Sequence, residues 1–121
     1  MKVLLVDDAA FVRMSLKEIL DKTEYEFTYV EAATGADAVH LYKAHHPDVV
    51  IMDITMPEMN GVEAVEKIKE IDEHAKIIMC SSMGYQEKVV DAISAGAVDF
   101  IVKPYTADKI VHAIEKALKL T

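Results

Sequence analysis

VVIMDITMPEMNG, residues 49–61, is the most informative stretch of the chain. Its first four residues form a continuous apolar run rich in β-branched side chains, which is typical of a strand buried on both faces of a parallel sheet. The run ends at Asp53, and a helical pattern begins at Asn60-Gly61, shortly after Pro57. Because open α/β sheets bind ligands at the carboxyl ends of their strands, Asp53 is a candidate functional carboxylate. The alternative is that Asp53 only begins a turn, as Asp often does.

Composition and charge limit the classes of protein to consider. The chain has 121 residues, 52% of them hydrophobic and 28% charged, which indicates one globular domain. A net charge of −8 without a basic stripe argues against nucleic acid as a partner. No apolar run approaches the roughly 18 residues of a membrane span, so membrane insertion is not expected. The absence of a signal peptide and the single cysteine, Cys80, predict a cytoplasmic protein.

Strand-like and helical patterns alternate five times along the chain. Strands are expected at residues 3–6, 27–32, 49–52, 77–80 and 98–102. Thr34 is expected to cap the second helix, and Gly96 to stop the fourth. Apolar residues at helical spacing mark the helices: Val12, Leu16, Ile19 and Leu20; Gly35, Ala38, Val39 and Tyr42; Val62, Val65 and Ile68; Val89, Val90 and Ile93; and Ile110, Val111, Ile114 and Leu118. This alternation predicts an α/β domain with a parallel sheet, right-handed crossovers and helices on both faces.

Polar residues follow the strands at their carboxyl ends. Asp7 and Asp8 follow the first strand, Asp53 the third, Ser81 the fourth and Lys103 the fifth. Carboxyl ends of parallel strands share one edge of the sheet, so these side chains should converge on one crevice. Three carboxylates together need a cation, and oxygen-only ligands favour Mg²⁺. Zinc is disfavoured, because the single cysteine and the scattered histidines lack ligand spacing.

A site that combines Mg²⁺, a lysine and a hydroxyl around one carboxylate suits phosphoryl transfer. Asp53 would be the nucleophile and would form an acyl phosphate. Neither GxxxxGK[ST] nor GxGxxG occurs, so a bound nucleotide donor is unsupported. Simpler roles remain for each residue: Asp8 could cap the first helix, Lys103 before Pro104 could belong to a surface turn, and Ser81 could be a loop residue.

Four motifs resemble those of response-regulator receiver domains: LLVDD at 4–8, MDITMPEMNG at 52–61, SSMG at 81–84 and KP at 103–104. The resemblance covers essentially the whole chain. It implies a flavodoxin-like, doubly wound sheet of five strands in the order 2-1-3-4-5 with five helices. It also implies that Asp53 takes a phosphoryl group from a phosphohistidine on a sensor histidine kinase. Such a chain is a phosphoacceptor that assists its own phosphorylation and dephosphorylation, not an enzyme.

The resemblance assigns roles to individual residues. Asp8, Asp53 and the backbone carbonyl of Thr55 would bind Mg²⁺, and Asp7 would contribute through water. Ser81 and Lys103 would contact the phosphoryl oxygens, and the Lys103–Pro104 bond is expected to be cis. Phe100 matches the aromatic switch position that acts with Ser81, but it lacks a hydroxyl, so the switch would act by burial of its ring.

Residues 1–121 are expected to form a single receiver domain without an output domain, and to be monomeric. The segments DDAAFVRM and FIVKPY are most similar to the corresponding segments of single-domain regulators of chemotaxis. A diffusible signal to a motor or adaptor protein is therefore the first hypothesis. It would bind through the fourth helix, fifth strand and fifth helix, with Tyr85, Phe100 and Tyr105 as anchors. The alternatives are a phosphorelay intermediate and a receiver excised from a DNA-binding regulator. An enzyme of the same fold lacks supporting motifs.

Overall fold

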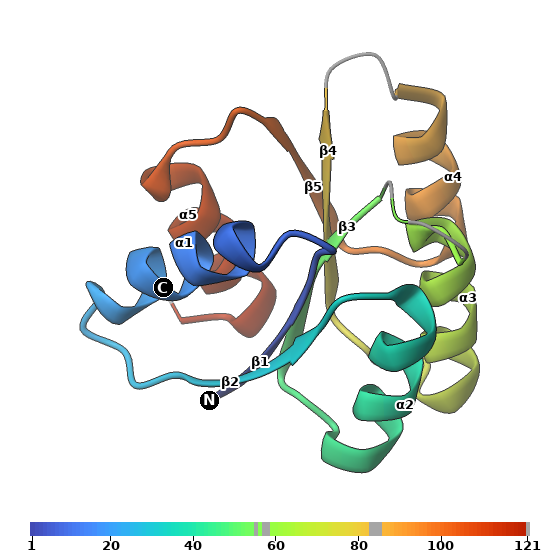
Figure 1. Cartoon of the computed structure of the whole chain (residues 1–121), viewed down its shortest axis with the longest axis horizontal. Coiled ribbons are helices and arrows are strands. Elements are labelled where there is room, and N and C mark those ends of the chain that lie inside the picture. Colours follow the sequence, from blue (N-terminus) through green and yellow to red (C-terminus); the bar gives the residue numbers. More distant parts are fainter. Residues whose placement is uncertain (55, 57–58, 83–85, 121) are drawn as a thin grey trace.

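The computed structural model describes residues 1–54, 56, 59–82 and 86–120, in which five parallel strands alternate with five helices (Figure 1). The sheet order is β2-β1-β3-β4-β5, which confirms the predicted flavodoxin-like topology. The strands are β1 (Lys2–Val6), β2 (Thr28–Ala32), β3 (Val49–Asp53), β4 (Ile77–Ser82) and β5 (Asp99–Lys103). The helices are α1 (Ala10–Asp21), α2 (Gly35–His45), α3 (Gly61–Ile71), α4 (Gln86–Ala95) and α5 (Ala107–Leu118).

The sheet separates two hydrophobic cores, because helices cover both of its faces. α1 and α5 lie on one face, and α2, α3 and α4 lie on the other (Figure 1). Side chains alternate along β1, so that Val3 and Leu5 enter the first core while Leu4 and Val6 enter the second. All five residues of β3 are buried, as its continuous apolar sequence predicts. The buried sheet is therefore a rigid platform that fixes where each strand ends.

Side-chain caps fix the starts of three helices near the carboxyl ends of the strands that precede them. Thr34 accepts a hydrogen bond from the Asp37 N–H, which confirms the predicted cap of α2. Asn60 caps α3 and Thr106 caps α5 in the same way. Each cap satisfies a backbone donor that the first turn of a helix leaves without a partner. These caps set the lengths of the loops at the carboxyl edge.

The strands differ from the sequence-based expectation by one or two residues at their ends, and α4 differs in the exposure of its apolar residues. β4 continues through Ser82 instead of ending at residue 80, and β5 begins at Asp99, one residue later than expected. All three apolar markers of α4 lie in the helix, but Val90 is 63% exposed and Ile93 is also exposed. α4 packs on the core through Val89 and Ala92, and its other apolar flank lies beside the edge strand β5. Helical periodicity identifies an apolar residue but not whether a neighbour covers it.

Gly61 provides a test of how tightly α3 packs against the end of β3. A Cβ atom there would lie 2.8 Å from both the Asp53 carbonyl oxygen and the Ile54 Cα atom. Alanine normally stabilises a helix relative to glycine. At this position we expect Gly61→Ala to lower the free energy of unfolding by about 1–3 kcal/mol, because backbone atoms must move. Urea titration measures the change. The control is Lys67→Ala, at an exposed position on α3, for which we expect a change in the free energy of unfolding within about 0.5 kcal/mol. An unchanged or raised stability of Gly61→Ala would contradict the tight packing.

Candidate functional site

Three carboxylates meet at the carboxyl edge of the two central strands. Asp7 and Asp8 follow β1, and Asp53 is the last residue of β3, which pairs directly with β1. Each contributes an oxygen atom that lies within 4.8 Å of the other two. Asp7 is only 4% exposed and Asp53 9%, whereas Asp8 is exposed. The cluster thus has two buried acids and one that faces solvent, an arrangement open to an ion or ligand from one side.

Lys103 supplies a cation to this cluster from the end of β5. Its Nζ atom lies 3.4 Å from Asp7 Oδ2 and 3.7 Å from Asp53 Oδ2, so its side chain extends past the end of β4. Burial lowers the pKa of Lys103, but the neighbouring charges of Asp53 and Asp7 outweigh that effect, and the net shift is upward. Lys103 therefore carries its charge at neutral pH. One ammonium group cannot balance three carboxylates.

The loop after β1 is held by Asp7 and not by Asp8. The Asp7 N–H donates to the Ala32 carbonyl at 3.1 Å, and Asp7 Oδ1 accepts from the Ala9 N–H at 2.9 Å. The residue at the N-cap of α1 is Ala9, which makes no side-chain cap. The alternative in which Asp8 caps the first helix is therefore wrong. Its carboxylate instead belongs to the acidic cluster.

The donor set fits Mg²⁺. It consists of carboxylate oxygens alone, the ligands that hard divalent cations prefer, with an exposed side where the ion can keep several water molecules. Among the described residues, no second group of histidine, cysteine or acidic side chains is arranged to hold a metal ion. Asp7, Asp8 and Asp53 are thus the residues that could hold the ion. Thr55, whose carbonyl was a predicted ligand, lies outside the described residues, and that prediction stays a prediction.

Ser81 and Phe100, the predicted switch pair, line the same cavity. Ser81 is fully buried and follows Cys80, the register partner of Asp53. Phe100 is 44% exposed on β5. Between them lies a pocket of about 360 Å³ whose other walls are apolar residues and serines: Ser82, Val89, Val90, Ile93, Ser94 and Val102. The cavity therefore connects the end of the strand next to Asp53 with the outer surface of α4 and β5.

The two tyrosines expected on this surface have different outcomes. Tyr85 lies outside the described residues. Tyr105 lines a separate groove with Phe11, Val12 and Lys103, and it packs against the core under α1 and α5. Burial, followed by the charges of Cys80, Asp7 and Asp53, raises the pKa of its hydroxyl to about 12. Tyr105 thus flanks the acidic cluster from the α1 side and does not line the pocket beside Phe100. The Lys103–Pro104 bond before it is cis, as the resemblance predicts.

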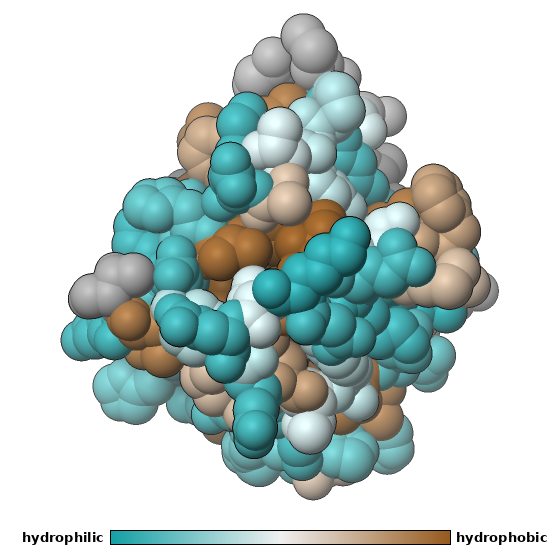
Figure 2. Space-filling model, turned by 90° about the vertical axis from the view of Figure 1, so that its left-hand side faces the viewer, coloured by the Kyte–Doolittle hydropathy of each residue, from teal (hydrophilic) through white to brown (hydrophobic). Residues whose placement is uncertain are grey.

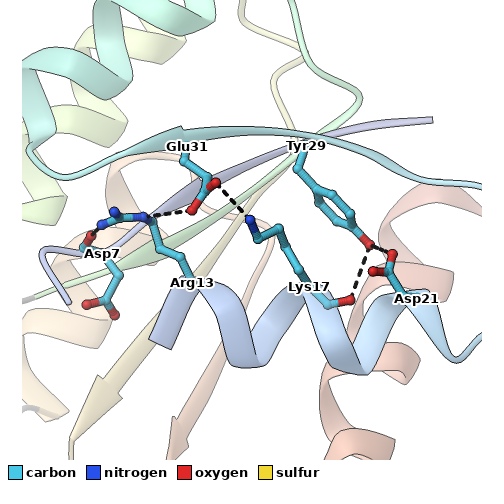
Figure 3. A network of polar contacts seen from close by, with 6 residues as sticks. All are labelled: Asp7, Arg13, Lys17, Asp21, Tyr29 and Glu31. Atoms are coloured by element: carbon cyan, nitrogen blue, oxygen red, sulfur yellow. Dashed lines mark hydrogen bonds and ion pairs between the residues drawn. The ribbon is translucent and has the colours of Figure 1, made fainter. Parts of the chain in front are cut away.

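A polar network behind Asp7 was missed by the sequence analysis (Figure 3). Arg13 donates from Nη1 to the Asp7 carbonyl oxygen, and its Nε lies 3.0 Å from Glu31 Oε1. Lys17 Nζ contacts the other oxygen of Glu31 at 2.9 Å. The sequence shows two cations four residues apart on one helix, but not the acid on β2 that they share.

Among the helices that the structure describes, none has the length and the apolar sequence that a membrane span requires.

Comparisons with known proteins agree with this geometry. The family model of the response regulator receiver domain matches residues 3–115. The chain is 58% identical to the chemotaxis protein CheY of Bacillus subtilis, over 97% of both chains. It is 55% identical to CheY of Thermotoga maritima, over 98% of both. A crystal structure of a receiver domain protein from Clostridium thermocellum superposes with a TM-score of 0.91 at 26% identity, and the match covers 98% of this chain and 94% of that one.

Mg²⁺ should stabilise the folded chain, because folding brings Asp53 next to Asp7 and Asp8 and the ion relieves the repulsion among the three carboxylates. We expect millimolar Mg²⁺ to raise the melting temperature of the wild type by a few degrees, and that of Asp8→Asn much less. Scanning calorimetry with and without the ion measures both shifts. Asp91→Asn, an exposed residue of α4, is the control and should respond like the wild type. Equal shifts in Asp8→Asn and the wild type would exclude Asp8 as a ligand.

Proposed function

This chain belongs to the receiver-domain family of response regulators, and from that membership we propose that Asp53 accepts a phosphoryl group from a phosphohistidine on a sensor histidine kinase. The observation that carries the proposal is the position of Lys103, whose ammonium lies between the Asp7 and Asp53 carboxylates at the carboxyl edge of the sheet. This cation lies where negative charge would be added to the site.

The transfer step follows from the chemistry of the two side chains. A carboxylate oxygen of Asp53 attacks phosphorus and forms an O–P bond, while the P–N bond to the imidazole breaks and the departing nitrogen takes up a proton. Lys103, 3.7 Å from Asp53 Oδ2, pairs with a phosphoryl oxygen. The Ser81 hydroxyl donates a hydrogen bond to another phosphoryl oxygen. Asp7, Asp8 and Asp53 would hold Mg²⁺, which would supply positive charge next to the phosphoryl oxygens.

Asp53 is the suitable nucleophile at this edge of the sheet. Its register partner Cys80 has a thiol whose pKa is raised by burial to about 12, so the thiol stays protonated at neutral pH. In the acyl phosphate, the phosphoryl group stays covalently attached to Asp53 of this protein. In this proposal the protein assists its own phosphorylation and dephosphorylation and is not an enzyme that acts on a separate substrate.

For the pathway, we propose chemotaxis. Two relatives named as chemotaxis proteins are 58% and 55% identical to this chain and match it over nearly their whole length. The kinase would be of the CheA type. Residues 1–121 would act as a monomeric receiver domain in the cytoplasm. The phosphorylated form would carry the signal to a motor or adaptor protein. The pocket beside Phe100 supports the surface of α4, β5 and α5 as the part that changes.

Phosphorylation at Asp53 has a direct test. Incubation with Mg²⁺ and acetyl phosphate should add one phosphoryl group, because the site itself supplies positioning and charge neutralisation. Intact-mass spectrometry counts the groups, and Asp53→Asn should carry none. Asp91→Asn removes an exposed carboxylate far along the chain and should be labelled like the wild type. Undiminished labelling of Asp53→Asn would exclude this residue as the acceptor.

The switch has a separate test by NMR spectroscopy with a beryllofluoride phosphoryl mimic. We expect large chemical-shift changes around the pocket, at Ser81, Ile93 and Phe100, because Phe100 can move into space next to Ser81. Phe100→Ala should reduce the changes on α4 while leaving those at Asp53. Changes confined to the three carboxylates in the wild type would show a phosphoacceptor without a switch.

A further inference from the structure

We propose that Arg13 is a positioning residue of the acidic cluster: held by Glu31, it fixes the Asp7 carbonyl and thereby the direction in which the Asp7–Asp8 turn presents its carboxylates to a divalent cation. This inference rests on the proposed Mg²⁺ site. Arg13 lies on α1, and Glu31 lies on β2, the strand next to β1. The guanidinium thus joins three elements at the point where the acidic turn begins (Figure 3).

The contacts of Arg13 are directional. Nη1 donates to the Asp7 carbonyl, and Nε donates to Glu31 at 3.0 Å, so two edges of one planar group are used at once. Its side chain is only 15% exposed. Glu31 is itself held by Lys17 at 2.9 Å, and the hydrogen bond from Lys17, followed by the one from Arg13, lowers the pKa of Glu31 despite the opposing effect of burial. Glu31 therefore stays ionised and keeps the guanidinium in place.

The carbonyl held by Arg13 belongs to the peptide bond between two of the three clustered acids. A peptide unit is planar, so fixing its oxygen fixes the plane and the position of the next Cα atom. The rest of Asp7 is already held by Ala32, Ala9 and Lys103. Asp8 is exposed. The orientation of the Asp7–Asp8 peptide sets the direction in which the Asp8 side chain leaves the backbone. Arg13 adds a hydrogen bond at the Asp7 carbonyl to these contacts.

Charge and geometry predict opposite effects when Arg13 is removed. A cation near a metal site repels the metal, so loss of its charge alone would tighten Mg²⁺ binding. Loss of a group that orients metal ligands weakens binding, typically about 10- to 100-fold. Because Glu31 offsets the charge of Arg13, we expect the geometric effect to dominate. The sign of the change in affinity therefore separates a positioning role from a general electrostatic one.

The experiment is an isothermal calorimetric titration of the full chain with Mg²⁺. Arg13→Ala should bind at least about 10-fold more weakly than the wild type. Lys17→Ala is the matched control: it removes one positive charge from the same helix and a contact to the same Glu31, but no bond to Asp7, and its affinity should stay within about two-fold. Arg13→Lys keeps the charge but cannot bridge both partners with one planar group, and should also bind several-fold more weakly.

The outcomes separate this inference from the proposed metal site. A wild type that binds no Mg²⁺ removes the proposed site and this inference with it. A wild type that binds, together with an Arg13→Ala protein of equal or higher affinity, overturns the positioning role alone. Circular dichroism checks that each variant is folded. If Arg13→Ala does not fold, Arg13→Lys decides, and wild-type affinity in that variant overturns the proposal.

Discussion

The cost of burying carboxylates at one edge of the sheet is the constraint on which the rest of the structure depends. Ionised groups are expensive to remove from water unless charges or hydrogen bonds compensate them. Asp7 and Asp53 are nearly buried. Part of their compensation comes from Lys103 on β5, far away in the sequence, and Asp7 also accepts from the Ala9 N–H, two residues along the chain. Among the described contacts, the single ammonium group of Lys103 lies beside a cluster of three acids, so negative charge remains. The remaining negative charge suits the site to bind a divalent cation.

Strand order explains how these residues meet. β1 and β3 are neighbours at the centre of the sheet, so Asp7 and Asp53 need only end their strands in register to come together. β5 is separated from β3 by β4, and the long side chain of Lys103 spans that distance. A shorter residue at the end of β5 could not reach either acid. The placement of β5 at the edge thus requires a long cation at this position.

Much of the site could be predicted from the sequence because strand ends are a property of one segment at a time. The apolar run before Asp53 ends at a carboxylate, and parallel topology then brings such ends to one edge. Arg13 and Val90 show where this reasoning stops. The partner of Arg13 is Glu31 on another element, and the exposure of Val90 depends on what covers α4. Local patterns contain neither fact. The tertiary packing that decides both is set by residues far away in the sequence.

The two faces of the sheet differ in how easily they could rearrange. Behind Asp7, ion pairs among Arg13, Lys17 and Glu31 hold the α1 face (Figure 3). The surface on this side has an apolar groove bordered by hydrophilic side chains (Figure 2). The α4–β5 side has an apolar pocket of about 360 Å³ and an exposed Phe100. Packed interiors move between discrete arrangements only where there is space to repack. The groove beside Tyr105 has about 450 Å³, so space alone does not distinguish the two sides. The ion pairs among Arg13, Lys17 and Glu31 do, because they resist movement on the α1 side, and a change at Asp53 should therefore move the α4–β5 side.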